Sequence, residues 1–164
     1  MTPPKETVER IADLAGEKGL TIAAAESLTS GLIASLLGAG PSASDWFRGS
    51  VVAYQESVKF EVLGVREGPV VTAECAEEMA RGAARLLAAD VAVAATGVGG
   101  PDPSEGKPAG TVYVAVTVDG KVTTRELDLD GDPEEILQDT ASHAIDLLLD
   151  TLAAHQPPPS EGVS

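Results

Sequence analysis

Cysteine, histidine, aromatic residues and basic residues are all scarce in this chain of 164 residues, and each scarcity narrows the class of protein. The single cysteine, Cys75, excludes a disulfide within the chain and fits a reducing cytoplasm. Aromatic residues make up only 3%, so aliphatic residues and alanine must fill the core. That composition favours helices packed closely on a sheet over an aromatic-rich barrel.

Basic residues number 11 against 26 acidic ones, which gives a formal net charge of −15. Binding to nucleic acid needs clustered Lys and Arg, so neither DNA nor RNA is expected as a partner. Anionic membrane surfaces are excluded on the same ground, and the acidity is typical of a soluble surface. No apolar run approaches the ~20 residues that cross a bilayer, and no signal peptide is expected at the N-terminus. We therefore expect a cytoplasmic protein.

The apolar pattern predicts helices alternating with strands. Helical spacing covers residues 3–19, 28–37, 56–63, 72–89 and 133–153, and short apolar runs that suit strands cover 20–26, 48–54, 90–96, 111–118 and 121–127. Asp119-Gly120 between the last two runs is a strong hairpin signal. We predict one three-layer α/β/α domain over residues 1–154, with a mixed, mostly parallel five-stranded sheet. The proline-rich tail, residues 155–164, is expected to be disordered.

Three segments with unusual residues follow three of the predicted strands: 26–31, 54–59 and 96–107. Ligands of open α/β sheets bind beyond the carboxyl ends of strands, so these segments converge if their strands are parallel neighbours. Ser27 lies at a junction of strand and helix, where a nucleophile can lie beside outward-pointing backbone amides. The competing interpretation is that Ser27 or Thr29 only caps the helix.

A serine hydroxyl needs a base to take its proton. His143 falls deep in the last predicted helix and His155 falls in the tail, so a lysine base is the better alternative. Lys59 is the best-placed candidate, although its pKa would have to fall from ~10.4 toward ~7–8 through burial. A solvated surface lysine is the alternative, and Glu56 on the same side would oppose the fall. Tyr54 either assists proton transfer or belongs to the core.

The segment 96–108 reads Thr-Gly-Val-Gly-Gly-Pro-Asp-Pro-Ser-Glu-Gly-Lys-Pro and must form a loop. It fits neither a Walker phosphate loop nor a dinucleotide fingerprint, because the spacing is wrong and Pro108 replaces the hydroxyl residue. We interpret it as a glycine loop that lets a ligand approach the backbone. No cluster with metal-ligand spacing is visible, so neither a metal nor another cofactor is indicated.

Together the three segments resemble the CinA C-terminal domain family, over about residues 8–152. Family members carry Ala-Glu-Ser-Cys-Thr-Gly-Gly, where residues 25–31 read Ala-Glu-Ser-Leu-Thr-Ser-Gly. They carry Gly-Gly-Val-Val-Ala-Tyr and then Lys, where 49–54 read Gly-Ser-Val-Val-Ala-Tyr before Lys59. They carry Thr-Gly-Ile-Ala-Gly-Pro and Lys-Pro-Val-Gly-Thr-Val-Tyr, where 96–101 and 107–113 read Thr-Gly-Val-Gly-Gly-Pro and Lys-Pro-Ala-Gly-Thr-Val-Tyr.

The resemblance implies an amidohydrolase of NAD recycling that converts nicotinamide mononucleotide to nicotinate mononucleotide and ammonia. It implies Ser27 as nucleophile, Lys59 as its base and Tyr54 as an assisting hydroxyl. The substrate is expected to contact hydroxyls and glycines of the first and third segments: Thr29, Ser30, Gly31, Thr96, Gly97, Gly99 and Gly100. A small-molecule nucleotide is thus the expected partner, and a homodimer stays open.

Two departures from the family pattern matter. Ser30 replaces a glycine, and the run Gly-Asp-Arg-x-x-Ile-Arg becomes Gly-Asp-Pro-Glu-Glu-Ile-Leu at 131–137, without either arginine. An anionic substrate would therefore bind weakly to this acidic chain unless backbone amides compensate. Two alternatives stay open beside the nucleotide amidase: an amidase of another, uncharged small amide, and a non-catalytic binding or regulatory module with the same fold.

Overall fold

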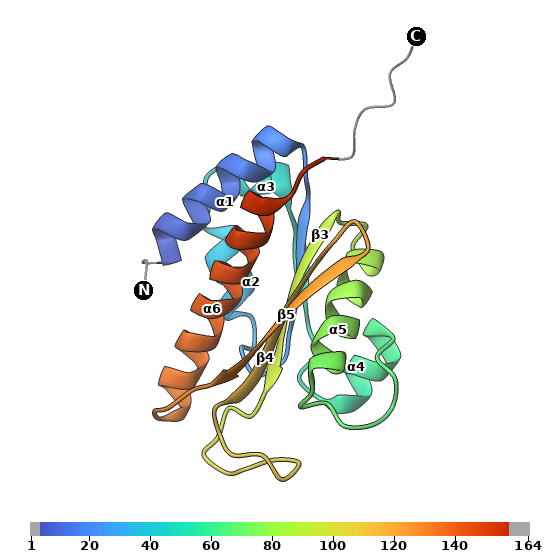
Figure 1. Cartoon of the computed structure of the whole chain (residues 1–164), viewed down its shortest axis with the longest axis vertical. Helices are drawn as coiled ribbons and strands as arrows, with labels where there is room; N and C mark the ends of the chain where they lie inside the picture. The colour runs from blue at the N-terminus through green and yellow to red at the C-terminus, as the bar shows by residue number, and fades with distance from the viewer. Residues whose placement is uncertain (1–3, 158–164) are drawn as a thin grey trace.

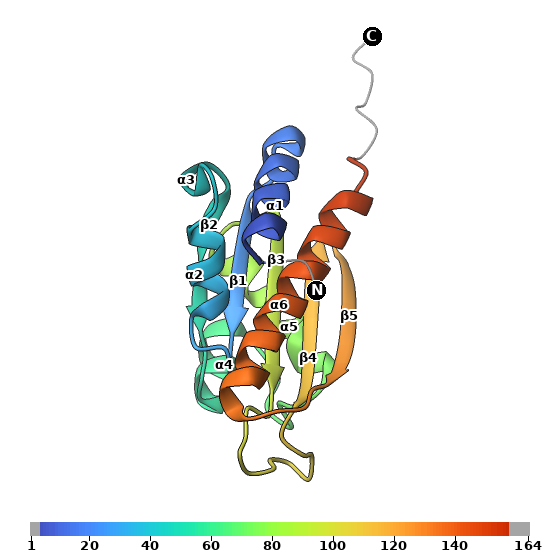
Figure 2. The same ribbon diagram turned by 90° about the vertical axis from the view of Figure 1, so that its left-hand side faces the viewer.

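The computed structural model describes residues 4–157, which form a five-stranded sheet covered by helices on both faces (Figures 1 and 2). The elements in chain order are α1 (Pro4–Lys18), β1 (Ile22–Glu26), α2 (Leu32–Gly38), α3 (Ala43–Trp46), β2 (Phe47–Val52), α4 (Glu56–Leu63), α5 (Ala73–Leu86), β3 (Val91–Gly97), β4 (Thr111–Val118), β5 (Lys121–Asp128) and α6 (Pro133–Ala154). The predicted fold class is confirmed. The prediction of one domain over residues 1–154 stays a prediction. The predicted disorder of the tail also stays a prediction, because residues 158–164 lie outside the described part.

The strand order β2-β1-β3-β4-β5 places the first three strands side by side and parallel. The carboxyl ends of β1, β2 and β3 therefore meet at one edge, as the sequence predicted. Residues 98–110 leave this edge as the long yellow loop in Figure 1. β4 and β5 add antiparallel pairs. Asp119 and Gly120 both have positive φ, as a two-residue hairpin turn requires.

Alternation along the buried strands divides the core into two layers. On one face, Ile22 and Ala24 of β1 pack with α1, α2 and α6. On the other, Ala23 and Ala25 pack with α5, whose own contacts are largely alanine. Small side chains on both sides bring this helix close to the sheet, which is how a core with few aromatic residues is filled.

Helix α2 starts at Leu32, so the predicted start near Leu28 is wrong. Ser30 and Gly31 take left-handed backbone conformations, with φ of 50° and 103°. The amide of Ser30 donates to the carbonyl of Ser27 at 3.1 Å, which closes a turn before the helix begins. Ser27 therefore lies in a turn and not in the first turn of a helix.

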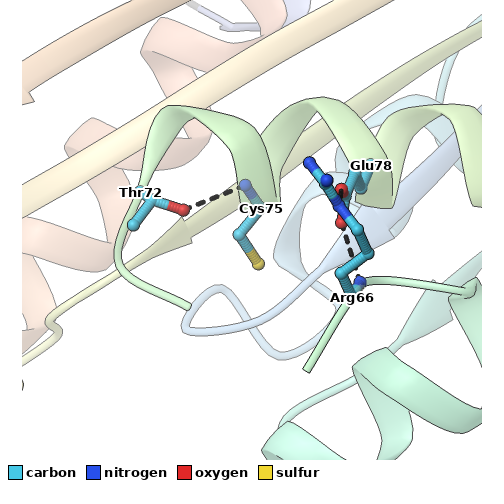
Figure 3. Close-up of polar contacts among 4 residues, drawn as sticks. All are labelled: Arg66, Thr72, Cys75 and Glu78. Atoms are coloured by element: carbon cyan, nitrogen blue, oxygen red, sulfur yellow. Dashed lines mark hydrogen bonds and ion pairs between the residues drawn. The ribbon is translucent and has the colours of Figure 1, made fainter. Parts of the chain in front are cut away.

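Helix α5 confirms its predicted N-cap. The Thr72 hydroxyl accepts a hydrogen bond from the amide of Cys75 at 3.0 Å (Figure 3). In the same view the guanidinium of Arg66 pairs with Glu78 at 2.6 Å, tying the segment before the helix to its second turn. The helix ends at Leu86 and not near Ala89, because Ala88 takes a left-handed conformation.

Candidate active site

A cavity of about 400 Å³ opens at the edge where the three parallel strands end. Its lining comes from all three predicted segments and from two further places, the segment before α5 and the start of α6. The lining residues are Ser27, Leu28, Ser30, Tyr54, Glu56, Lys59, Val70, Val71, Thr96, Gly97, Gly99, Gly100, Ser104, Pro133 and Leu137. The volume lies within the roughly 300–1,000 Å³ typical of ligand pockets.

Ser27 follows β1 directly and is 7% exposed. Its amide donates to the carbonyl of Ala95 on β3 at 3.2 Å, which anchors the serine to the neighbouring strand. Neither Ser27 nor Thr29 caps α2, whose N-cap residue is Gly31. The simple capping interpretation of Ser27 is therefore wrong.

The helix start is held by Glu26, a fully buried carboxylate that sequence reasoning missed. It accepts hydrogen bonds from the amides of Gly31, Ile33 and Ala34 at 2.8–3.2 Å. It also accepts from the hydroxyls of Thr29 at 2.9 Å and Ser50 at 3.0 Å. An acidic residue that closes an otherwise apolar strand was the available signal.

This arrangement separates the predicted substrate residues into two groups. Thr29 and Gly31 point their donors at Glu26 and do not line the cavity. Ser30, Thr96, Gly97, Gly99 and Gly100 do line it. The hydroxyl of Thr96 already donates to the carbonyl of Val70 at 2.9 Å, so it fixes the wall of the cavity.

Lys59 lies on α4 and is 2% exposed, so the interpretation as a surface lysine is wrong. Its Nζ donates to the carbonyls of Ala53 at 2.8 Å and Tyr54 at 3.1 Å. Within residues 4–157 no carboxylate lies at ion-pair distance from it. Burial lowers the pKa of Lys59, and this effect exceeds the opposing influence of Cys75, Glu56 and Glu105.

Tyr54 lies at the mouth of the cavity with 67% of its surface exposed, so the alternative of a core tyrosine is wrong. Cys75 is buried, as predicted, and burial raises the pKa of its thiol to about 11 despite nearby Lys59. The thiol is therefore neutral at physiological pH.

Val70 and Val71 form a further part of the cavity wall, a strap that precedes α5. Their amides donate to the carboxylate of Glu105 at 2.8–3.1 Å. Lys107 donates to the carbonyl of Val71 and lies 5.2 Å from the ring centroid of Tyr113. The loop 98–110 thus holds the strap in place.

The described residues contain neither a metal-binding cluster nor a membrane-spanning helix. No group of three or more His, Cys, Asp or Glu within 4–157 is arranged to hold a metal ion. None of the helices in that range has the length and apolar character needed to span a membrane.

Comparison with known proteins relates this site to one family. A model described as the CinA C-terminal domain matches residues 4–152. A CinA-like protein of Dictyoglomus turgidum is 40% identical over 146 residues, which cover 85% of this chain and 36% of that protein. A putative competence-damage inducible protein of Geobacillus kaustophilus is 42% identical over 156 residues, 91% of this chain and 36% of the relative. The chain thus spans about a third of the length of these curated relatives.

Solved structures of similar fold match almost the whole chain. The competence damage-inducible protein A of Klebsiella pneumoniae is 30% identical with a TM-score of 0.91, over 94% of this chain and 100% of that one. The competence/damage inducible protein of Agrobacterium tumefaciens is 32% identical with a TM-score of 0.86, over 93% and 98%. This chain therefore belongs to the CinA C-terminal domain family.

Proposed function

We propose that this chain is a cytoplasmic serine amidohydrolase of NAD recycling, which hydrolyses the carboxamide of nicotinamide mononucleotide to the carboxylate and ammonia. Ser27 is the nucleophile and Lys59 the general base. The family names report no reaction, so the proposal rests on the chemistry of the cavity and on the resemblance in sequence.

The observation that carries the proposal is the environment of Lys59. A neutral amine has two hydrogens and one lone pair. Its two hydrogens match the carbonyls of Ala53 and Tyr54, which leaves the lone pair to accept a proton. Burial lowers the lysine pKa and so favours this neutral form. Ser27 lines the same cavity and supplies that proton.

The proposed reaction has two steps. Lys59 takes the hydroxyl proton while Oγ of Ser27 bonds to the carboxamide carbon, giving a tetrahedral intermediate. Its collapse breaks the C–N bond, and the proton held by Lys59 passes to the leaving nitrogen, which departs as ammonia. Water then attacks the ester, Lys59 again takes and returns a proton, and the carboxylate is released with Ser27 restored.

The developing oxyanion needs backbone donors that the fold has not already used. Within residues 4–157, the amides of Leu28, Gly99 and Gly100 donate no hydrogen bond to the chain, and all three residues line the cavity. The amide of Leu28 directly follows the nucleophile, the position that supplies an oxyanion donor in nucleophile elbows. We assign Leu28 this role and Tyr54, at the mouth, the role of assisting proton transfer.

Ammonia release from nicotinamide mononucleotide tests the proposal. Ser27→Ala should lower kcat by about 10³-fold or more, because no other group replaces the nucleophile. Ser57→Ala removes an exposed hydroxyl on the same helix as Lys59 and is the matched control, with a rate within about twofold of the wild type. Equal rates for Ser27→Ala and the wild type would refute the assignment.

A further inference from the structure

The cavity has fewer positively charged side chains than a site that binds a phosphate usually has. Its lining holds one cation, Lys59, and one carboxylate, Glu56. A general base works in its neutral form, so the active site in its working state carries a negative charge and no positive one. From α6 the cavity receives Pro133 and Leu137, which offer a phosphate neither charge nor hydrogen bond.

Several backbone amides that would suit an anion are already used by carboxylates of the chain. Glu26 holds the amides at the start of α2, and Glu105 holds those of Val70 and Val71. At α6 the carboxylate of Asp132 accepts from the amide of Glu135 at 2.9 Å in a capping box. A phosphate at any of these places would meet a carboxylate.

Only uncharged donors remain for an anion. They include the amides of Leu28, Gly99 and Gly100 and the hydroxyl of Ser104, whereas the hydroxyl of Ser30 already donates to the carbonyl of Leu28 at 3.3 Å. One of the amides is required for the oxyanion. Hydrogen bonds that involve a cation are about twice as strong as neutral ones, so these donors recognise a phosphate poorly inside a protein of net charge −15.

We propose that this site selects phosphate-free pyridine carboxamides, of which nicotinamide riboside is the type, over the phosphorylated nucleotide. The inference rests on the proposed function, because it takes the cavity to bind the pyridine carboxamide at Ser27. The riboside is cationic through its ring nitrogen, whereas its phosphate makes the nucleotide net negative. Glu56 and the net negative charge of the chain attract the first and repel the second.

Steady-state kinetics of ammonia release from the two compounds test this selection. We expect kcat/KM for nicotinamide riboside to exceed that for nicotinamide mononucleotide at low ionic strength. Added NaCl should raise KM for the riboside and lower it for the nucleotide, since salt screens both interactions. An equal or higher kcat/KM for the nucleotide overturns the selection but leaves the proposed function standing. Hydrolysis of neither compound overturns the proposed function itself.

A gain of phosphate recognition provides a second readout. Leu137→Arg places a cation at the cavity wall and should raise kcat/KM for the nucleotide by about tenfold, without a matching rise for the riboside. Leu86→Arg makes the same change of net charge at an exposed residue of α5 outside the cavity and is the control. If Leu86→Arg raises the nucleotide rate as much as Leu137→Arg, the lining of the cavity does not set the selection and the inference is wrong.

Discussion

Lys59 is the residue whose chemistry depends most directly on the fold. Because burial lowers its pKa, the neutral amine forms at lower pH than in a solvated lysine. We predict that kcat/KM rises with pH through the pKa of Lys59 in the folded protein. Lys59→Arg should lower kcat by about 10²–10⁴-fold and lose this rise, because arginine stays protonated. A wild-type pH–rate profile without such a limb would contradict the assignment of the base.

The same pKa shift also affects stability. Between the lowered pKa of Lys59 and its ordinary value, the unfolded chain binds more protons than the folded chain, so the free energy of unfolding rises with pH in that window. Below the window the charged, buried amine destabilises the fold. Lys59→Met should therefore lack this rise, and Lys121→Met, at an exposed lysine, should retain it. Denaturant unfolding across the alkaline range measures the difference.

The sequence predicted the reacting side chains but not the groups that hold them. Ser27 and Lys59 are visible because strand ends and family motifs mark them. The role of Glu26 depends on a turn, residues 28–31, that helical periodicity alone assigns to the helix. Glu105 acts on Val70 and Val71 across 34–35 positions in the chain, and no local pattern reports such a contact.

At the scale of elements, the end of α4 packs directly on α5 through Gly82. A Cβ built on Gly82 would lie 2.1 Å from the carbonyl oxygen of Leu63, the last residue of α4. Gly82→Ala should therefore push α4, and with it Lys59, away from α5. We predict a loss of about 2 kcal/mol or more in the free energy of unfolding and a lower kcat.

Gly16 in α1 provides the opposite case for comparison. A Cβ there meets no atom within 4 Å, so Gly16→Ala keeps the native packing and reduces the freedom of the unfolded chain. It should raise the free energy of unfolding by about 0.5–1 kcal/mol and leave kcat unchanged. Stabilisation by Gly82→Ala similar to that by Gly16→Ala would contradict the close contact of the two helices.

Element boundaries were predictable where local chemistry fixes them. Gly64 ends α4 in a left-handed conformation, and the hydroxyl of Thr72 caps α5, as residue type alone indicated. Helix α3 was missed because its four residues lie in a stretch rich in Gly, Pro and Ser, whose composition is typical of a loop. There the burial of Trp46 against the core outweighs weak local preference.

For the molecule as a whole, the sequence predicted the layers and the shared edge but not the strand order. Alternating helices and strands favour parallel neighbours, and a hairpin adds antiparallel ones. Nothing local placed β1 between β2 and β3, which is the arrangement that brings Ser27 and Lys59 to one cavity. The presence of these two residues in one cavity is therefore a property of the topology.

The net charge of −15 makes self-repulsion a property of the entire surface. We predict that the midpoint of thermal unfolding rises by about 2–4 °C when NaCl increases from 0.01 M to 0.5 M, because the Debye length falls from ~30 Å to below ~10 Å. Exposed pairs such as Arg125 with Asp150 at 2.9 Å weaken in salt, but each contributes at most about 1 kcal/mol. Thermal unfolding followed by circular dichroism at each salt concentration measures the net change in the midpoint.

Neutralising part of the acidic surface tests whether charge repulsion causes the predicted rise of the midpoint with NaCl. Glu9→Gln combined with Glu17→Gln on the exposed face of α1 changes the net charge from −15 to −13, since two carboxylates are lost. This variant should start from a higher unfolding midpoint at low salt and gain less from NaCl than the wild type, because repulsion is already reduced. A midpoint that falls with NaCl in the wild type would show that ion pairs outweigh repulsion. The net charge of the chain would then no longer explain why the cavity disfavours a phosphate. Only the charge of Glu56 and the uncharged lining from α6 would still explain it.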